Sequence, residues 1–137
     1  MDETRREFAR YWLDMAAHDI HCARVTNSNP AVPRDSVICA CQRGAEKAVK
    51  AFLLFKGISP PKTQNLRWLA LEAAKIELRF LDHMRDAAAL TPYAWMFRCS
   101  DDMLDTYPTE LEVDRAFWEA AGIYDFVLNL MPPEFRP

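Results

Sequence analysis

The chain has 137 residues, of which half are hydrophobic and only three are glycine. This length suits one domain with its own core, and this composition disfavours intrinsic disorder and glycine-rich β folds. The formal charge of -3 at pH 7 excludes a general cationic coat for nucleic acids, so any anion site must be local.

The cellular compartment can be predicted from the start of the chain, its hydrophobic runs and its cysteines. The first ten residues are charged from the second position and lack the apolar region of a secretory signal. The longest hydrophobic run, 51–55, is far shorter than the roughly 20 residues that span a bilayer. Cys22, Cys39, Cys41 and Cys99 are scattered and form no disulfide or zinc framework. We therefore expect a cytoplasmic protein with reduced thiols and no membrane partner.

The first half of the chain predicts two long helices. Apolar residues recur at helical spacing over 3–25, and the polar segment 27–30 ends that pattern. A second helix is predicted from about residue 35 to residue 56, with Pro33 suited to its start and Gly57 to a left-handed cap at its end. Gly44 lies inside this helix. Because a mid-helix glycine costs about 1 kcal/mol relative to alanine, we expect another backbone to approach closely there.

The second half is less regular but also helical. Residues 66–85 have helical composition, and Thr91-Pro92 separates them from a predicted short aromatic helix at 93–98. A polar loop over 101–108 precedes Thr109 and Glu112, whose spacing is typical of a capping box that starts a last helix. The sequence thus predicts an all-α, up-and-down bundle of about five helices. Residues 1–137 form one domain, with 132–137 as a short flexible tail.

The last helix is apolar on more than one side. Val113 and Phe117 mark one apolar stripe, whereas Leu111, Trp118 and Phe126 lie outside it. The interior of one bundle needs only one such stripe, so the surplus predicts a second buried surface, most simply a twofold homodimer interface. The alternative is that Trp118 or Phe126 only covers a neighbouring loop.

Four segments match one known family in residue type, order and spacing. The segment 41–57, CQRGAEKAVKAFLLFKG, is similar to the family's second helix, and the segments TQNL at 63–66 and RCS at 98–100 stand where many members read T-H-D-L and R-Y-P. The family's first-helix pattern is matched by Trp12, Leu13, Ala16, Asp19, Ile20 and Ala23. Over roughly residues 8–130 the chain resembles the HEPN domain family, and this resemblance implies the same all-α fold.

The same resemblance directs attention to Arg98. Active HEPN ribonucleases resemble one another in an R-x(4-6)-H motif, whose arginine and histidine from two subunits meet at the dimer cleft. If Arg98 is the family arginine, the histidine is replaced here by Met103, Leu104 and Asp105. Methionine and leucine cannot transfer a proton, and an ionised aspartate repels phosphate. We therefore expect a HEPN-like binding module without the ribonuclease motif, in which Arg98 is the one candidate for a catalytic role.

A basic line on the second helix is the candidate anion site. Arg43, Lys47 and Lys50 recur at intervals of four and three residues, so they share one side of the helix. Together with Arg98 they could hold the phosphate of a nucleotide or of a short RNA segment. The alternative is a solvated helix face on which Glu46 pairs with Lys50.

The histidines offer two weaker alternatives. His83 follows Arg79 by four residues, and as a relocated base it would make the chain an active, metal-free ribonuclease toxin. His18 and His21 form an H-x-x-H pair without a defined third ligand, which is too few donors for zinc. We predict no metal and no cofactor.

Family resemblance also suggests a partner. Compact HEPN proteins resemble the partner of a minimal nucleotidyltransferase in two-component toxin–antitoxin modules. The resemblance implies a homodimer that binds such a transferase, a nucleotide or RNA through the Arg98 region and the basic line. Two rival functions are an active ribonuclease and a purely structural dimerisation module.

Overall fold

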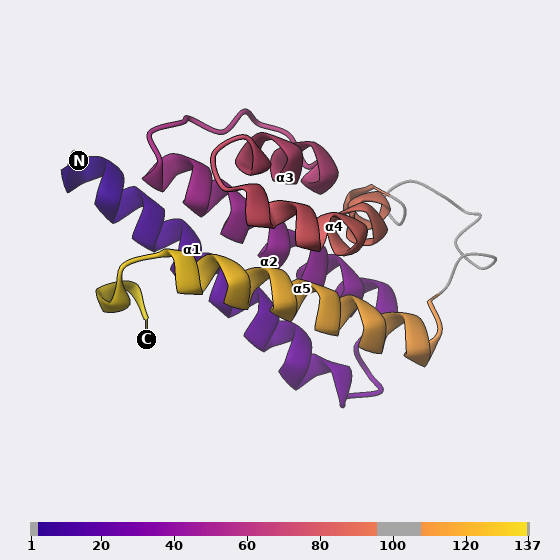
Figure 1. The fold of residues 1–137 in the computed structure, drawn as a ribbon. Coiled ribbons are helices and arrows are strands. Elements are labelled where there is room, and N and C mark those ends of the chain that lie inside the picture. The colour runs from indigo at the N-terminus through magenta and orange to yellow at the C-terminus, as the bar shows by residue number, and fades with distance from the viewer. Residues whose placement is uncertain (1–2, 96–107, 137) are drawn as a thin grey trace.

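In the part of the chain that the structure describes, three long α-helices carry the fold, and two short α-helices and three 3-10 segments complete it. The computed structural model describes residues 3–95 and 108–136. The long helices are α1 (Glu3–Asn27), α2 (Arg34–Phe55) and α5 (Glu110–Leu130), and the short ones are α3 (Leu66–Ala74) and α4 (Met84–Leu90) (Figure 1). The 3-10 turns are η1 (Leu78–His83), η2 (Thr91–Ala94) and η4 (Pro133–Phe135). The predicted all-α class is confirmed, and no described helix combines the length and apolarity of a membrane span.

Gly44 lies where α2 crosses α1. A Cβ atom on Gly44 would lie 2.7 Å from Cγ1 of Ile20 and 3.2 Å from the backbone oxygen of Ala16. Both distances are shorter than ordinary van der Waals contact, so only glycine allows this approach without a shift of α1. The close backbone contact expected from the sequence is therefore present, inside the bundle.

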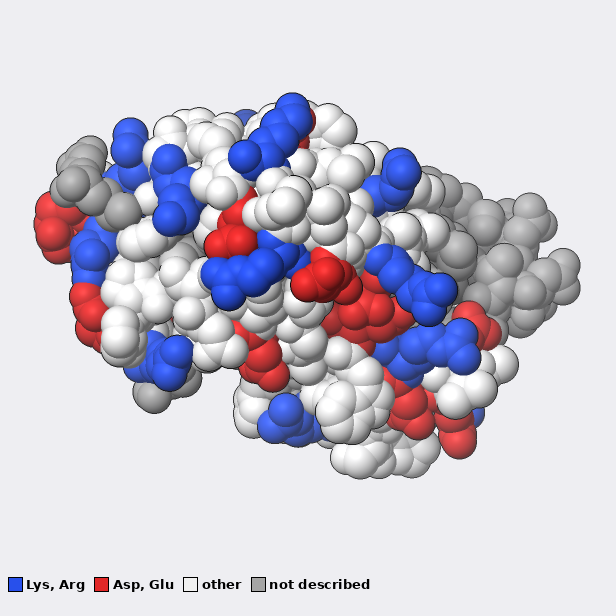
Figure 2. All heavy atoms as spheres, in the orientation of Figure 1, with Lys and Arg blue, Asp and Glu red and all other residues white. Residues whose placement is uncertain are grey.

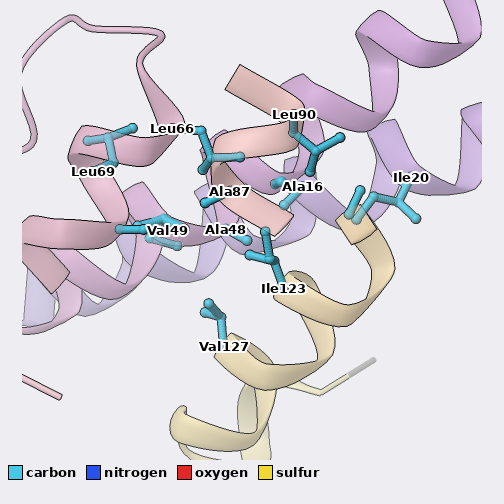
Figure 3. Packing of buried hydrophobic residues seen from close by; sticks show 14 of the residues in the cluster. Ala16, Ile20, Ala48, Val49, Leu66, Leu69, Ala87, Leu90, Ile123 and Val127 are labelled. Carbon is cyan, nitrogen blue, oxygen red and sulfur yellow. The ribbon is translucent and has the colours of Figure 1, made fainter. Parts of the chain in front are cut away.

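The core forms around α2, which packs against α1, α3 and α5. Figure 3 shows side chains from all five α-helices in this region. The labelled residues are Ala16, Ile20, Ala48, Val49, Leu66, Leu69, Ala87, Leu90, Ile123 and Val127, and all of them are buried. Small residues on α2 let its neighbours come close, while branched residues on α3, α4 and α5 fill the remaining space.

The middle of the chain differs from the single helix predicted over 66–85. Helix α3 ends at Ala74, and Glu77 adopts an extended conformation in which its side chain accepts a hydrogen bond from the Arg79 N–H. This break turns Phe80 into the core, where its ring centroid lies 4.9 Å from that of Phe52 and 4.8 Å from that of Phe126. An uninterrupted helix would not place Phe80 between these two rings. Tertiary packing therefore overrides the local helical propensity of this segment.

The short aromatic helix predicted at 93–98 is also different. Residues 91–94 form the 3-10 turn η2, whereas 96–98 lie outside the described residues. The Arg67 N–H donates to Thr91 Oγ1 at 2.9 Å, which ties the start of α3 to the start of this turn.

The predicted helix ends are confirmed at two places. Gly57 has a φ of 89°, and its N–H donates to the Leu54 carbonyl at 3.0 Å while the Ile58 N–H donates to the Leu53 carbonyl at 2.9 Å. This is a glycine-based cap on α2. At the start of α5, Thr109 and Glu112 form the reciprocal capping box.

The C-terminal segment packs more tightly than a loose tail would. Phe135 is buried, its ring centroid lies 5.8 Å from that of Phe55, and the Arg6 guanidinium lies 5.2 Å from its ring centroid. Arg6 also forms an ion pair with Glu134. Two prolines redirect the chain after α5, so Phe135 reaches back to α1 and α2.

The α1–α2 crossing yields a stability prediction. Gly44→Ala should lower the free energy of unfolding by about 1 to 2 kcal/mol, because overpacking outweighs the gain in helix propensity. In an Ile20→Ala background, which removes the atom nearest to the new Cβ, the same change should cost about 1 kcal/mol less. Urea denaturation of the four proteins in this cycle measures the coupling, and equal costs in both backgrounds would contradict the steric explanation.

Candidate functional site

Arg98 lies outside the described residues, as do Met103, Leu104 and Asp105. The described residues before and after them contact α2. On the incoming side, the Cys39 thiol donates to the Tyr93 carbonyl at 3.5 Å. On the outgoing side, Arg34 Nη1 donates to the Pro108 carbonyl at 3.3 Å. Arg34 and Cys39 both belong to the N-terminal half of α2. The described residues Tyr93 and Pro108 therefore both contact this half of α2.

The basic line on α2 carries less free charge than the sequence suggests. Lys47 Nζ donates to Asp19 Oδ2 of α1 at 2.7 Å. Lys50 Nζ donates to Glu46 Oε2 at 3.3 Å and lies 5.7 Å from the centroid of the Trp12 ring. Both lysines are thus paired with carboxylates.

Arg43 differs from these two lysines. It is exposed, and the ion pairs within 3–95 and 108–136 do not include it. Of the three predicted cations on α2, Arg43 alone presents an uncompensated charge to solvent.

A buried polar network on α2 was only partly predicted. Gln42 Nε2 lies within hydrogen-bond distance of Glu46 Oε1, at 3.3 Å, and of the Gln64 carbonyl, at 3.2 Å. Gln42, Glu46 and Lys50 are all buried. The Glu46–Lys50 pair considered from the sequence exists, but it lies inside the protein rather than on a solvated face. The i, i+4, i+8 spacing of these three polar residues was the signal that could have revealed the network.

Carboxylates gather on the side where the chain leaves η2. Burial raises the pKa of Glu119 on α5 to about 7, and the Asp86 carboxylate on α4 raises it further while Arg115 opposes the shift. Burial and the carboxylates of Glu112 and Glu119 also raise the pKa of the Tyr93 phenol. The cluster joins residues that are distant in sequence, so no local pattern predicts it.

Figure 2 agrees with this local balance of charge. On the face that it shows, lysine and arginine side chains are interspersed with aspartate and glutamate, and no large purely basic area is visible. A phosphate ligand would have to use a small number of residues.

The Arg79 and His83 pair does not form a site. Arg79 donates from Nε and Nη2 to the Glu77 carboxylate at 3.0 and 2.8 Å. The His83 ring lies against the Phe126 ring, with centroids 4.4 Å apart, and its Nδ1 is buried without a hydrogen-bond partner. Phe126 is thus occupied by Phe80 and His83, as the alternative interpretation of the last helix proposed.

The remaining candidates concern metals and thiols. His18 Nε2 lies 3.5 Å from Cys22 Sγ. Within the part of the chain that the structure describes, no three His, Cys, Asp or Glu side chains are arranged to hold a metal ion. Burial raises the pKa of the Cys41 thiol to about 12, which leaves it protonated and unreactive.

The fold and these residues define an all-α bundle whose described part brings together no pair of catalytic side chains. A family model, the HEPN domain, matches residues 9–130, and the chain belongs to this family. The resemblance found in its helices is confirmed.

Two solved structures are similar to the chain. The protein TT1696 from Thermus thermophilus is 23% identical with a TM-score of 0.74, over 90% of this chain and 98% of the other. ST0689, an archaeal HEPN homologue, is 22% identical with a TM-score of 0.71, over 89% of this chain and 96% of the other. No curated protein matches the chain. The structural likeness establishes the fold alone.

The raised pKa of Glu119 predicts a change of stability with pH. Its ordinary value is 4.5 and its value in the folded chain is about 7, so the folded state binds this proton more tightly than the unfolded state. Stability should therefore fall as pH rises from about 4.5 to about 7. Glu119→Gln should reduce the loss of stability between pH 5 and pH 8, measured as the shift of the urea midpoint.

Glu7→Gln provides a matched control for this measurement, because Glu7 is an exposed carboxylate on α1. It should leave the pH dependence unchanged. An equal loss of stability in Glu119→Gln and the parent chain would contradict the assigned role of Glu119.

Proposed function

We propose that this chain is a HEPN-type binding module of the cytoplasm that acts as a homodimer and does not cleave RNA. One observation carries the proposal: the positions that would hold the ribonuclease histidine after Arg98 hold Met103, Leu104 and Asp105. None of these can serve as a proton-transfer group near neutral pH while also tolerating phosphate. The isolation of His83 from Arg79 also speaks against a relocated base.

A protein partner suits the surface best. Lys47 and Lys50 are paired with carboxylates, so they offer little free positive charge to a phosphate. By contrast, α3, η1 and their connection expose large apolar side chains, which are Trp68, Leu71, Ile76, Leu78 and Leu81. Exposed apolar residues at this density are typical of protein-binding surfaces. By family resemblance, the partner is a minimal nucleotidyltransferase in a toxin–antitoxin-type system.

A phosphate ligand is the second candidate, and Arg43 supports it. This arginine is exposed, has no ion pair among the described residues, and lies one helical turn after Cys39. Cys39 contacts Tyr93 shortly before the segment that carries Arg98. In this second candidate function, Arg98 and Arg43 contact the phosphate of a nucleotide or of single-stranded RNA. Lys47 and Lys50 follow Arg43 along α2 and add positive charge near it.

The phosphate candidate is tested by titrating labelled single-stranded RNA at two salt concentrations and following fluorescence polarisation. Arg98→Ala and Arg43→Ala should each weaken binding by about tenfold if they contact phosphate, and binding should weaken with salt. Arg10→Ala, which removes an exposed arginine of α1, should have no effect.

Gels run on the same samples report cleavage. RNA that is cut by the parent chain and left intact by Arg98→Ala would overturn the non-catalytic proposal. Absence of saturable binding at low salt would reject the phosphate candidate and leave the protein partner.

The protein candidate is tested by coexpressing the chain with a minimal nucleotidyltransferase, taken from the neighbouring genes if one is encoded there. Leu78→Asp and Leu81→Asp should each reduce copurification by about tenfold or more, because a charge would enter an apolar contact. Val25→Asp changes an exposed apolar residue near the end of α1 and should leave the complex intact. If Leu78→Asp and Leu81→Asp leave copurification as high as Val25→Asp does, the apolar surface of α3 and η1 is not the binding surface.

A further inference from the structure

A polar hollow lies at one end of the bundle, between the connection from α1 to α2 and the start of α5. Its volume is about 620 Å³, which is within the range of roughly 300 to 1,000 Å³ that small-molecule sites occupy. Residues 27–30 and 32 form one side, Arg34 contributes from α2, and Glu110 and Asp114 contribute from α5. In Figure 1 the α1–α2 connection and the first turn of α5 lie at the same end of the bundle.

Two side-chain bridges to α5 frame this hollow. Asn27 Nδ2, at the end of α1, donates to Asp114 Oδ1 at 3.4 Å. Arg34 Nη2, at the start of α2, donates to Glu110 Oε1 at 3.2 Å, and Arg34 Nη1 donates to the Pro108 carbonyl at 3.3 Å. The hollow is therefore held open by bonds between parts of the chain that are far apart in sequence.

The hollow has more capacity to accept hydrogen bonds than to donate them. Its arginine and the Asn27 amide already direct their donors at α5. Asp114 forms no ion pair within 3–95 and 108–136, so the partner of its charge there is a neutral amide. A carboxylate has about four acceptor positions, and Asp114 therefore keeps room for further donors. A ligand that brings N–H groups and positive charge suits this arrangement.

The helix starts beside the hollow do not favour an anion. Helix α5 begins with the Thr109–Glu112 capping box and carries Glu110 in its first turn. In the first turn of α2, the Asp35 carboxylate accepts a hydrogen bond from the Ser36 N–H. Negative side chains of the protein thus already offset the positive ends of both helix dipoles.

We propose that this hollow binds an aliphatic diamine or polyamine. One ammonium group donates to Asp114, and the second approaches Glu110 on the side away from Arg34. These two carboxylates are one helical turn apart, so their Cβ atoms are separated by roughly 5 to 6 Å, a spacing that a few methylene groups can cover. The methylene chain lies along Pro30 and Val32, which are the apolar part of the wall.

Isothermal titration calorimetry of the parent chain with spermidine tests the site. The parent should show one saturable site whose affinity falls as salt is added. Asp114→Asn should weaken binding by about tenfold or more, because it removes the charge without changing the shape of the side chain. Asp125→Asn makes the same change at an exposed aspartate of α5 that does not line the hollow, and it should bind like the parent.

A second pair of variants tests the hollow from within. Ser28→Lys places an ammonium group on its wall, where it should compete with spermidine and weaken binding by about tenfold or more. Ala88→Lys adds the same charge at an exposed position of α4 outside the hollow, and it should change the affinity by less than about threefold. Thermal unfolding verifies that all four variants remain folded.

The number of ammonium groups that the hollow recognises is tested with N-acetyl-lysine amide. This probe carries one ammonium group and also represents a lysine side chain of a partner protein. It should bind at least about tenfold more weakly than spermidine, because it can reach only one of the two carboxylates. A probe that binds as tightly as spermidine would overturn the assignment to a diamine or polyamine.

Two outcomes would overturn the site itself. One is the absence of saturable spermidine binding at low salt. The other is equal binding by the parent, Asp114→Asn and Asp125→Asn, which would mean that the net negative charge of the chain alone attracts the amine. The RNA and copurification experiments judge the proposed function independently of both outcomes.

Discussion

The close approach of α1 and α2 at Gly44 is the constraint on which the rest of the structure depends. With no side chain at this position, α1 lies near enough for its carboxylate at Asp19 to reach Lys47 and for Trp12 to lie over Lys50. Helix α2 then becomes the centre of the bundle, with α1 on one side and α3 and α5 on others. Most of its surface is buried as a result, including three polar side chains that would be solvated on an ordinary outer helix.

This central position changes what the cations of α2 can do. A lysine on a peripheral helix is available to a ligand, whereas a buried lysine must keep its carboxylate partner or leave a charge unpaired. Lys47 and Lys50 are therefore part of the internal architecture. Of the predicted cations on α2, Arg43 is the exposed one without an ion pair among the described residues, so recognition of phosphate would depend on a small number of arginines.

The sequence predicted those features that local chemistry determines. Helical spacing gave the long helices, Gly57 and the Thr109–Glu112 pair gave two helix ends, and Gly44 gave the close crossing. The break between α3 and α4 could not be predicted in this way. Its local composition is helical, and its cause is the insertion of Phe80 between two rings that lie far away in the sequence.

The same distinction applies to the candidate site. The cations of α2 were visible as a pattern, but the ion pair of Lys47 with Asp19 depends on which face of α2 meets α1. The rise that Asp86 causes in the pKa of Glu119 depends on how α4 meets α5. Both are consequences of packing. Arg98 was identified by resemblance, and its place relative to Arg43 lies outside the described residues.

The contacts of the C-terminal turn have a consequence for how copies of the chain can associate. A terminal helix that is held only along its length can leave its own bundle and replace the same helix in another copy, which is domain swapping. Here the turn after α5 is anchored to α1 and α2 by Phe135 and by the Arg6–Glu134 ion pair. An exchange of α5 would have to break these contacts as well as the core, so the turn favours association between intact bundles over exchange of helices.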